Sequence, residues 1–122
     1  MTATIRLLMF ITALPLVAHA AAPQLAKDMP FMSARKLLLK ERWRPVNIHA
    51  NDDYALMGVE HELAKKRVKE FDACSIDYSN CVMRYKRGNE CLTVYTSGEK
   101  IKDMKVVHWS DECARQAQSP AK

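Results

Sequence analysis

The chain has 122 residues, with 19 basic and 14 acidic side chains, a formal net charge of +5 and four cysteines. This length fits one small domain, and its three glycines leave no glycine-rich loop of the kind that cradles phosphate. The cysteines include no C-x2-C pair, so zinc knuckles, thioredoxin-type redox centres and c-type haem sites all lack their ligand spacing.

Residues 1–20 have the features of a secretory signal peptide. One cation, Arg6, precedes an apolar run from Leu7 to Val17, and the segment ends in the small-x-small signal Ala18-His19-Ala20. The run is shorter than the roughly 20 apolar residues that span a bilayer, so we expect an exported, periplasmic protein without a transmembrane segment. The exported part is expected to comprise a flexible leader at 21–30, one domain at 31–113 and a tail at 114–122.

The first element predicted in the domain is a helix from Ser33 to Arg42. Ser33 can cap its N-terminus, and Met32 can pack on Leu37 as a hydrophobic staple. Arg44-Pro45 is expected to end it, because proline disfavours helical backbone in the preceding residue.

A second helix is predicted to start near Asn51-Asp52 and to run towards Lys69. At 100° per residue most apolar side chains of this stretch fall on one half of a cylinder, as in a helix that covers a core. Glu60 and Arg67 interrupt that half and Gly58 weakens the start, so the regular helix should be shorter than the whole stretch.

The pattern then alternates with a period of two, which predicts three antiparallel strands in the segments CVMRYKR, CLTVYTS and MKVVHW. A first turn at Gly88-Asn89 would set Tyr85 opposite Leu92, and a second turn at Gly98 would set Ser97 opposite Met104. One face of the sheet would then carry the apolar residues Met83, Tyr85, Leu92, Val94, Val107 and Trp109. The expected fold class is α+β, with two N-terminal helices packed on a three-stranded antiparallel sheet.

The four cysteines of an exported chain predict two disulfides. The register above places Cys91 opposite Ser110, three residues before Cys113, so we expect a bridge from Cys91 to Cys113. Cys74 then pairs with Cys81 around the loop SIDYSN. Each closure stabilises a small domain by about 2–4 kcal/mol.

Two segments resemble small exported proteins, mostly uncharacterised and proteobacterial. MPFMSARKLLLKERWRPV is similar to their "aRklLlkxGWxP" opening, and FDACSIDYSNCVMRYKRGNECLTVYTSGE to their cysteine-flanked strand and "CLxVxTxGE" segment. Arg42 stands where that pattern has glycine. The resemblance implies structural motifs without catalytic residues. The element order is also similar to the two-helix, three-strand module of periplasmic assembly-factor and beta-lactamase-inhibitor domains, which is a likeness of fold only.

The sequence does not predict an enzyme, a cofactor or a metal site. His49, His61 and His108 have no serine, cysteine or paired carboxylates in a recognisable catalytic order. Glu60 and Glu62 flank His61, but neighbours on a helix point apart.

A protein-binding surface is the favoured prediction. The other sheet face would expose Arg84, Thr93, Tyr95 and His108, and Tyr and Arg are frequent anchors of protein interfaces. We therefore predict a small periplasmic protein of inhibitor or immunity type that occludes an envelope enzyme or a toxin, with no nucleic-acid partner. The alternative is a non-enzymatic accessory protein held to an envelope polymer or a membrane surface by its charge, including the basic helix ARKLLLKERWR.

Overall fold

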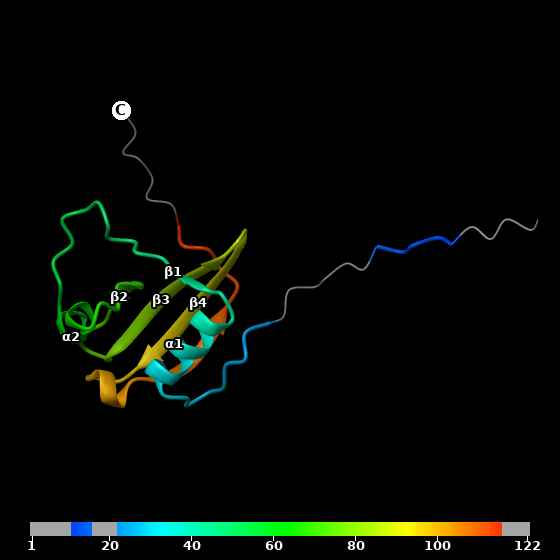
Figure 1. Ribbon diagram of the computed structural model, residues 1–122. Coiled ribbons are helices and arrows are strands. Elements are labelled where there is room, and N and C mark those ends of the chain that lie inside the picture. The colour runs from blue at the N-terminus through cyan, green and yellow to red at the C-terminus, as the bar shows by residue number, and fades with distance from the viewer. Residues whose placement is uncertain (1–10, 16–21, 116–122) are drawn as a thin grey trace, which may run out of the picture.

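The computed structural model of the protein describes residues 11–15 and 22–115 (Figure 1). Residues 1–10 and 16–20 of the predicted signal peptide and residues 116–122 of the predicted tail lie outside the described residues. Within the described ranges, neither helix has the length and apolar character needed to cross a membrane.

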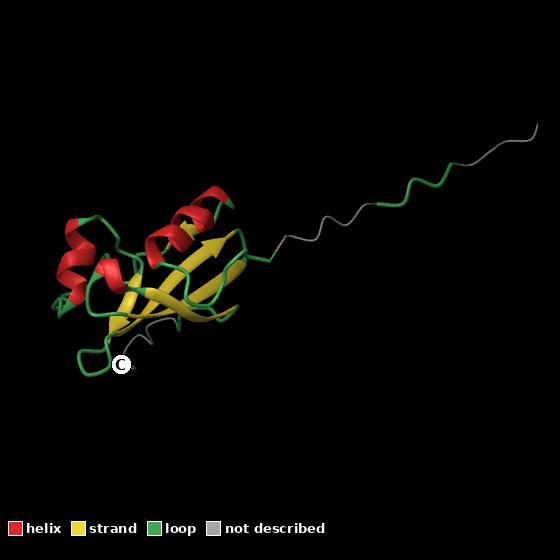
Figure 2. Cartoon of the chain, turned by 90° about the horizontal axis from the view of Figure 1, so that it is seen from below, coloured by secondary structure: helices red, strands yellow, loops and turns green. Residues whose placement is uncertain are grey.

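The architecture is α+β, with two α-helices, one 3-10 helix and a five-stranded antiparallel sheet. In chain order the elements are α1 (Phe31–Lys40), β1 (Arg44–Pro45), α2 (Val59–Lys65), β2 (Phe71–Cys74), β3 (Asn80–Arg87), β4 (Glu90–Ser97), η1 (Ile101–Asp103) and β5 (Lys105–Ser110). The strand order is β1-β3-β4-β5, and β2 also pairs with β3. The helices gather on one side of the strands (Figure 2). The predicted class is confirmed, but the sheet has two more strands than the three expected.

Helix α1 begins at Phe31, two residues earlier than predicted, and ends at Lys40. Its start is fixed by tertiary contact, because the Phe31 N–H donates to the carbonyl of Met104 at 2.9 Å and the Phe31 side chain is buried. Ser33 therefore lies inside the helix, and no side chain caps the N-terminus. Ala34 and Leu38 are buried, and α1 contacts β5.

Helix α2 covers only Val59–Lys65, so the long helix predicted from Asn51 is wrong over its first half. Gly58 has a φ of +55°, a left-handed conformation that breaks the helix before Val59. Glu60, expected to disturb an apolar face, is completely buried and organises the preceding loop through hydrogen bonds. Arg67, with a φ of +59°, ends the helical backbone.

The two additional strands both pair with the outer edge of β3. Arg44 and Pro45, predicted only to end the first helix, pair with Lys86 and Tyr85 as β1. Strand β2 pairs Phe71 with Met83 further along the same edge. Such short strands cover an edge that would otherwise expose unpaired backbone groups.

The central hairpin has the predicted register. Tyr85 lies opposite Leu92 and Met83 opposite Val94, with Gly88 in a left-handed turn conformation. The buried core combines these strand residues with both helices and is formed by Phe31, Ala34, Leu38, Trp43, Leu63, Val68, Phe71, Met83, Tyr85, Leu92, Val94, Met104 and Val106. Alternation along a half-buried strand is thus sufficient to orient β3 and β4.

The register predicted between β4 and β5 is wrong. Ser97 pairs with Lys105, Tyr95 with His108 and Val94 with Trp109, with an irregularity between Tyr95 and Thr96. Val107 has no partner in this ladder and is 38% exposed, whereas Val106 is fully buried in its place. A bulge inserts one extra residue into one strand. The side chains beyond it therefore lie opposite different residues of the neighbouring strand than an unbroken alternation predicts.

Both predicted disulfides are confirmed, Cys74–Cys81 and Cys91–Cys113. Cys74 lies directly opposite Cys81 in the β2–β3 ladder. Ser110, the residue on which the second pairing was argued, lies opposite Thr93 instead of Cys91. The predicted pairing is correct although the predicted register is wrong by two residues, because Cys113 lies beyond the end of β5 and is not held in the ladder.

Candidate functional site

Arg84 and Thr93, two of the predicted partner-binding residues, form an internal polar chain on the outer sheet face. The Arg84 guanidinium contacts the Asp72 carboxylate at 2.8 Å and donates to the Thr93 hydroxyl at 2.7 Å. That hydroxyl donates in turn to the carbonyl of Glu112 at 2.8 Å, and Thr93 is completely buried. In this conformation the pair fixes the segment after β5 and leaves little surface for a partner.

Tyr95 and His108, the other two predicted residues, form a second pair. They lie opposite each other on β4 and β5, with ring centroids 5.5 Å apart and planes tilted by 32°. Tyr95 is half-buried and His108 is exposed. The structure thus divides the four predicted residues into two pairs, of which only Tyr95 and His108 present a ring surface.

The loop between β2 and β3, residues 75–79, carries the most exposed large apolar side chains of residues 22–115. Ile76 is 64% exposed and Tyr78 is 77% exposed. The sequence analysis assigned this loop to turn formation only, although two apolar residues among turn formers between closely spaced cysteines were a usable signal.

Several contacts define the conformation of the loop. The Cys74–Cys81 disulfide closes it, and the Ser75 N–H donates to the carbonyl of Asn80 at 2.7 Å. The Ser79 carbonyl accepts from the Gly98 N–H at 2.9 Å. Gly98 cannot be replaced without displacing the chain, because a Cβ there would lie 2.6 Å from the carbonyl oxygen of Asp103. The exposed side chains are therefore presented on a backbone that is held at both ends.

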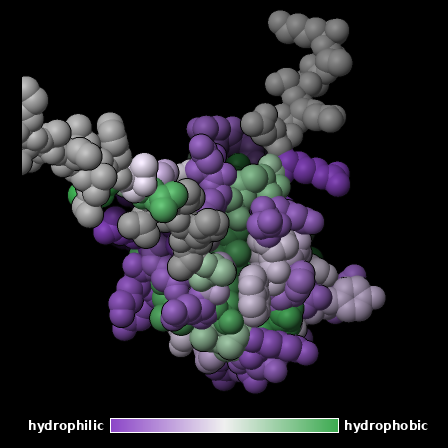
Figure 3. Space-filling view, turned by 90° about the vertical axis from the view of Figure 1, so that its right-hand side faces the viewer, coloured by the Kyte–Doolittle hydropathy of each residue, from purple (hydrophilic) through white to green (hydrophobic). Residues whose placement is uncertain are grey.

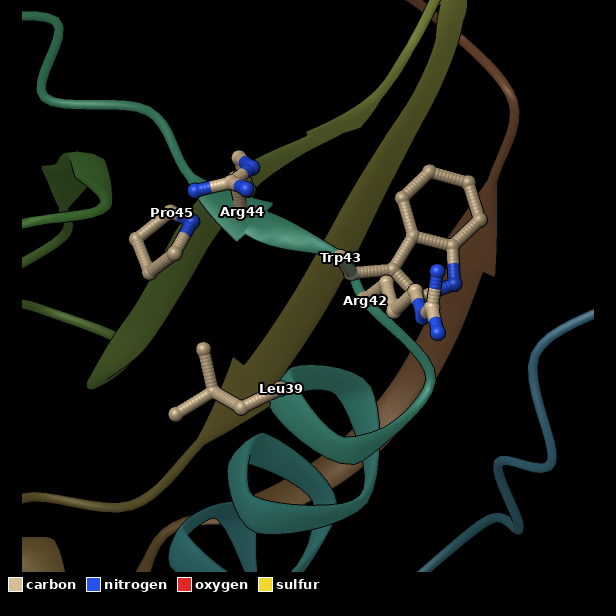
Figure 4. A pocket seen from close by; sticks show the side chains of 5 residues that line it. All are labelled: Leu39, Arg42, Trp43, Arg44 and Pro45. Carbon is tan, nitrogen blue, oxygen red and sulfur yellow. The ribbon is translucent and has the colours of Figure 1, made fainter.

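A groove of about 600 Å³ lies where the chain passes from α1 to β1 (Figure 4). It is lined by Leu39, Arg42, Trp43, Arg44 and Pro45. Figure 3 views the molecule from the side of this connection, where hydrophilic side chains surround a strip of apolar ones. The Arg87 guanidinium stacks over the Trp43 ring at 4.3 Å and donates to the carbonyl of Glu41. The groove is thus both basic and partly apolar.

His49 is the only histidine of residues 22–115 whose two ring nitrogens both have partners. Nδ1 lies 2.8 Å from the Asp52 carboxylate and Nε2 lies 2.5 Å from the carbonyl of Asp72. Burial lowers the pKa of His49, but the hydrogen bonds to Asp72 and Asp52 raise it more, so the pKa lies above 6.5. The same hydrogen bond lowers the pKa of Asp52. With both nitrogens facing acceptors, the environment favours the protonated ring, and His49 is poorly placed to act as a base.

Two buried carboxylates, Glu60 and Glu70, accept hydrogen bonds that connect elements of the fold. Glu60 accepts from the Tyr54 hydroxyl, where burial and the carboxylate raise the tyrosine pKa to about 12. Glu70 accepts from the Tyr85 hydroxyl and pairs with Arg35. Burial and the Glu70 charge raise the pKa of Tyr85 well above its usual value. Among residues 11–15 and 22–115, no group of three His, Cys, Asp or Glu side chains could hold a metal ion.

Comparison of the chain with family models, with curated proteins and with solved structures gave no match.

Proposed function

We propose that this is an exported protein-binding protein of inhibitor or immunity type, which occludes an envelope enzyme or a toxin. The observation that carries the proposal is the disulfide-closed loop 75–79, with Ile76 64% and Tyr78 77% exposed. Apolar side chains displayed at a loop tip gain free energy when a partner covers them, at about 25 cal/mol per Å² of apolar surface. A tyrosine also supplies a polar tip for a directed hydrogen bond.

Restraint of the loop favours binding. Ordering a flexible segment on association costs free energy, and a segment that is already fixed avoids this cost. The disulfide and the hydrogen bond from Gly98 to Ser79 supply that fixation before any partner arrives. A disulfide-closed loop with exposed apolar side chains suits contact with the concave site of an enzyme or a toxin.

The loop is connected to the exposed part of the predicted sheet face. Asn80, the residue after the loop, pairs with Ser97, and Tyr95 lies two residues along β4 from Ser97. Tyr95 and His108 would then form the continuation of the contact surface, with Arg84 and Thr93 holding its backbone in position. The interaction would be steric, with apolar contact at its centre and polar groups around it.

The test compares capture of a partner by matched variants of the disulfide-intact protein. The double variant Ile76→Ser, Tyr78→Ser should bind a partner isolated from envelope extract about 100-fold more weakly, as expected for two anchor residues. The control variant Met32→Ser, Met57→Ser removes two apolar side chains that are 38% and 45% exposed elsewhere, and should bind as the wild type does. Equal affinity of the loop variant and the control, with both folded, would show that the loop is not the contact.

The basic groove favours a second candidate, an accessory protein held to an anionic envelope polymer or a membrane surface. The two functions differ in their response to salt. A loose charge contact weakens steeply at moderate ionic strength, whereas a packed interface centred on Ile76 and Tyr78 persists. Affinity measured over a salt series therefore separates them.

A further inference from the structure

A pocket of about 290 Å³ lies on the core side of the sheet and is distinct from the groove beside α1. Two tryptophans and Leu92 line it, with Trp43 coming from the connection between α1 and β1 and Trp109 from β5. Trp109 pairs with Val94, which lies two residues along β4 from Leu92, so Leu92 and Trp109 share one face of the sheet. The two-tryptophan pocket thus has an apolar and aromatic floor made by three separate parts of the chain.

Two carboxylates lie at the rim of the two-tryptophan pocket. Glu90 from β4 and Asp111 from the segment after β5 both line it, and both are exposed. Asp111 forms no hydrogen bond or ion pair with residues 11–15 and 22–115. Glu90 contacts Arg87, but each of these contacts is long, at 3.5 Å. The rim therefore offers carboxylate oxygens that can accept hydrogen bonds from a ligand.

The pocket also has a donor that lacks an acceptor. Trp43 is 3% exposed, and its indole N–H has no hydrogen-bond partner in the described part of the chain. A buried donor without an acceptor is costly, and such groups are rare in folded proteins. Figure 4 shows the indole extending away from Leu39 and Pro45, so its nitrogen does not face the groove that these two residues line. Since Trp43 also lines the pocket with Trp109, we place the unpartnered N–H on that side.

One wall of the pocket is displaced at low cost. It is formed by Ala22 and Pro23, which make no hydrogen bond or ion pair with the rest of the described chain. The next residue, Gln24, is held in place, because its backbone N–H donates to the Glu41 carboxylate at 3.3 Å. A ligand can therefore displace this wall, and approach the covered Trp43 N–H, without breaking a hydrogen bond.

The polar groups of the pocket select the chemistry of a ligand. An ammonium ion would suit the carboxylates and the aromatic rings, but it has no acceptor for the Trp43 N–H. A phosphate or a carboxylate would accept from that N–H but would be repelled by Glu90 and Asp111. A hydroxyl group both donates and accepts, so an uncharged ligand with several hydroxyls satisfies the donor and both acceptors.

We propose that the two-tryptophan pocket binds an uncharged saccharide. The C–H groups on one side of a sugar ring pack against the negative face of an aromatic ring, here Trp109, while the sugar hydroxyls donate to Asp111 and accept from the Trp43 N–H. Ligand pockets typically have volumes of about 300–1,000 Å³, so this pocket suits a ligand of one or two sugar rings. The pocket lies at the other end of β4 from loop 75–79 and does not depend on the function proposed for that loop.

The experiment follows the two indole N–H signals by NMR in the disulfide-intact protein, and the variant Trp109→Phe assigns them. Maltose, cellobiose and N,N′-diacetylchitobiose are titrated as probes. Choline chloride and sodium phosphate, which represent the two rejected ligand classes, are each compared with sodium chloride at equal ionic strength. We expect both indole signals to shift saturably with at least one disaccharide. The absence of a saturable shift with all three, or a response to choline or phosphate as large as that to a disaccharide, would overturn the proposal.

The matched variants are Asp111→Ala and Asp53→Ala. Both aspartates are exposed and form no hydrogen bond or ion pair in the described part of the chain, so neither change should disturb the fold. Asp53 lies in the loop before α2 and does not line the pocket. Asp111→Ala should weaken disaccharide binding about tenfold through loss of a charge-assisted hydrogen bond, and Asp53→Ala should leave it unchanged. Equal affinity of the two variants for the disaccharide would place its binding outside the two-tryptophan pocket and overturn the proposal.

Discussion

The two buried carboxylates, Glu60 and Glu70, are both fully buried but are stabilised in different ways. Glu60 accepts only from neutral donors, the backbone N–H groups of Met57 and Cys74 and the hydroxyl of Tyr54. Glu70 has a charged partner, Arg35, at 2.6 Å, and the hydroxyl of Tyr85 at 2.8 Å.

The difference reflects what each carboxylate connects. Glu60 holds one continuous stretch, because its donors come from the loop before α2 and from the strand that follows it. Glu70 joins α1 to the sheet, since Arg35 lies on α1 and Tyr85 on β3. A local loop can be ordered by backbone donors, whereas a contact between separate layers uses long side chains.

The largest effect is expected at Glu70. Arg35→Ala would leave a buried carboxylate without its cation, and removal of one partner of a buried pair costs about 3–5 kcal/mol. Arg35 is 21% exposed, so water can reach the site and the lower end of the range is expected. Urea denaturation measures the loss of free energy of unfolding. The double variant Arg35→Ala, Glu70→Gln should recover part of it, and a double variant as unstable as Arg35→Ala would contradict the charge argument.

A smaller loss is expected at Glu60. In Glu60→Gln one carboxylate oxygen becomes an NH₂ group, which faces donors instead of accepting from them. Each donor left without an acceptor costs about 1–3 kcal/mol, so the variant should lose about 2 kcal/mol by the same measurement. Glu99→Gln, at an exposed position, is the control and should change stability little. A loss no greater than that of the control would show that the charge of Glu60 is dispensable.

The smallest effect is the dependence of stability on pH that comes from His49. Its ring stacks on Tyr54, the tyrosine that donates to Glu60, with ring centroids 3.6 Å apart. Its pKa is raised on folding, so its contribution to stability is complete below about pH 6.5 and is lost as pH rises through the raised value. The neutral ring can donate to only one of its two acceptors, Asp52 and Asp72, and Asp72 is also paired with Arg84.

Melting temperatures of the wild type and of His49→Gln should therefore differ most in mild acid and converge at alkaline pH. His61→Gln is the matched control, because His61 is exposed and forms no hydrogen bond, ion pair or ring contact within residues 11–15 and 22–115. A wild-type advantage over His49→Gln that stays constant with pH would exclude the charged ring as its source.

The candidate surfaces were predictable only in part. Strand alternation placed Arg84 beside Thr93, and the ladder confirms this pair. It could not show that Thr93 is buried, because the Glu112 segment that covers it belongs to a part of the chain without periodicity. Ile76 and Tyr78 were missed because polar turn formers dominate their loop. The groove was missed because its lining residues come together only when the chain turns after α1 and enters β1 beside β3.

The sequence by itself determined the features that depend on near neighbours and on cysteine chemistry. Ala34 and Leu38, one helical turn apart, give α1 its buried side, and the Gly88 turn with alternating side chains specifies the central hairpin. The four cysteines specify two disulfides.

Tertiary structure decided the features in which a local preference competes with a contact from elsewhere in the chain. The Met104 carbonyl moved the start of α1, and burial of Glu60 converted half of a predicted helix into a loop. The bulge at Val107 shifted the pairing of β5 with β4, so that Val106 is buried instead of Val107. Periodicity indicates which side chains favour burial. The hydrogen bonds that satisfy a buried backbone group or carboxylate, however, come from residues distant in sequence.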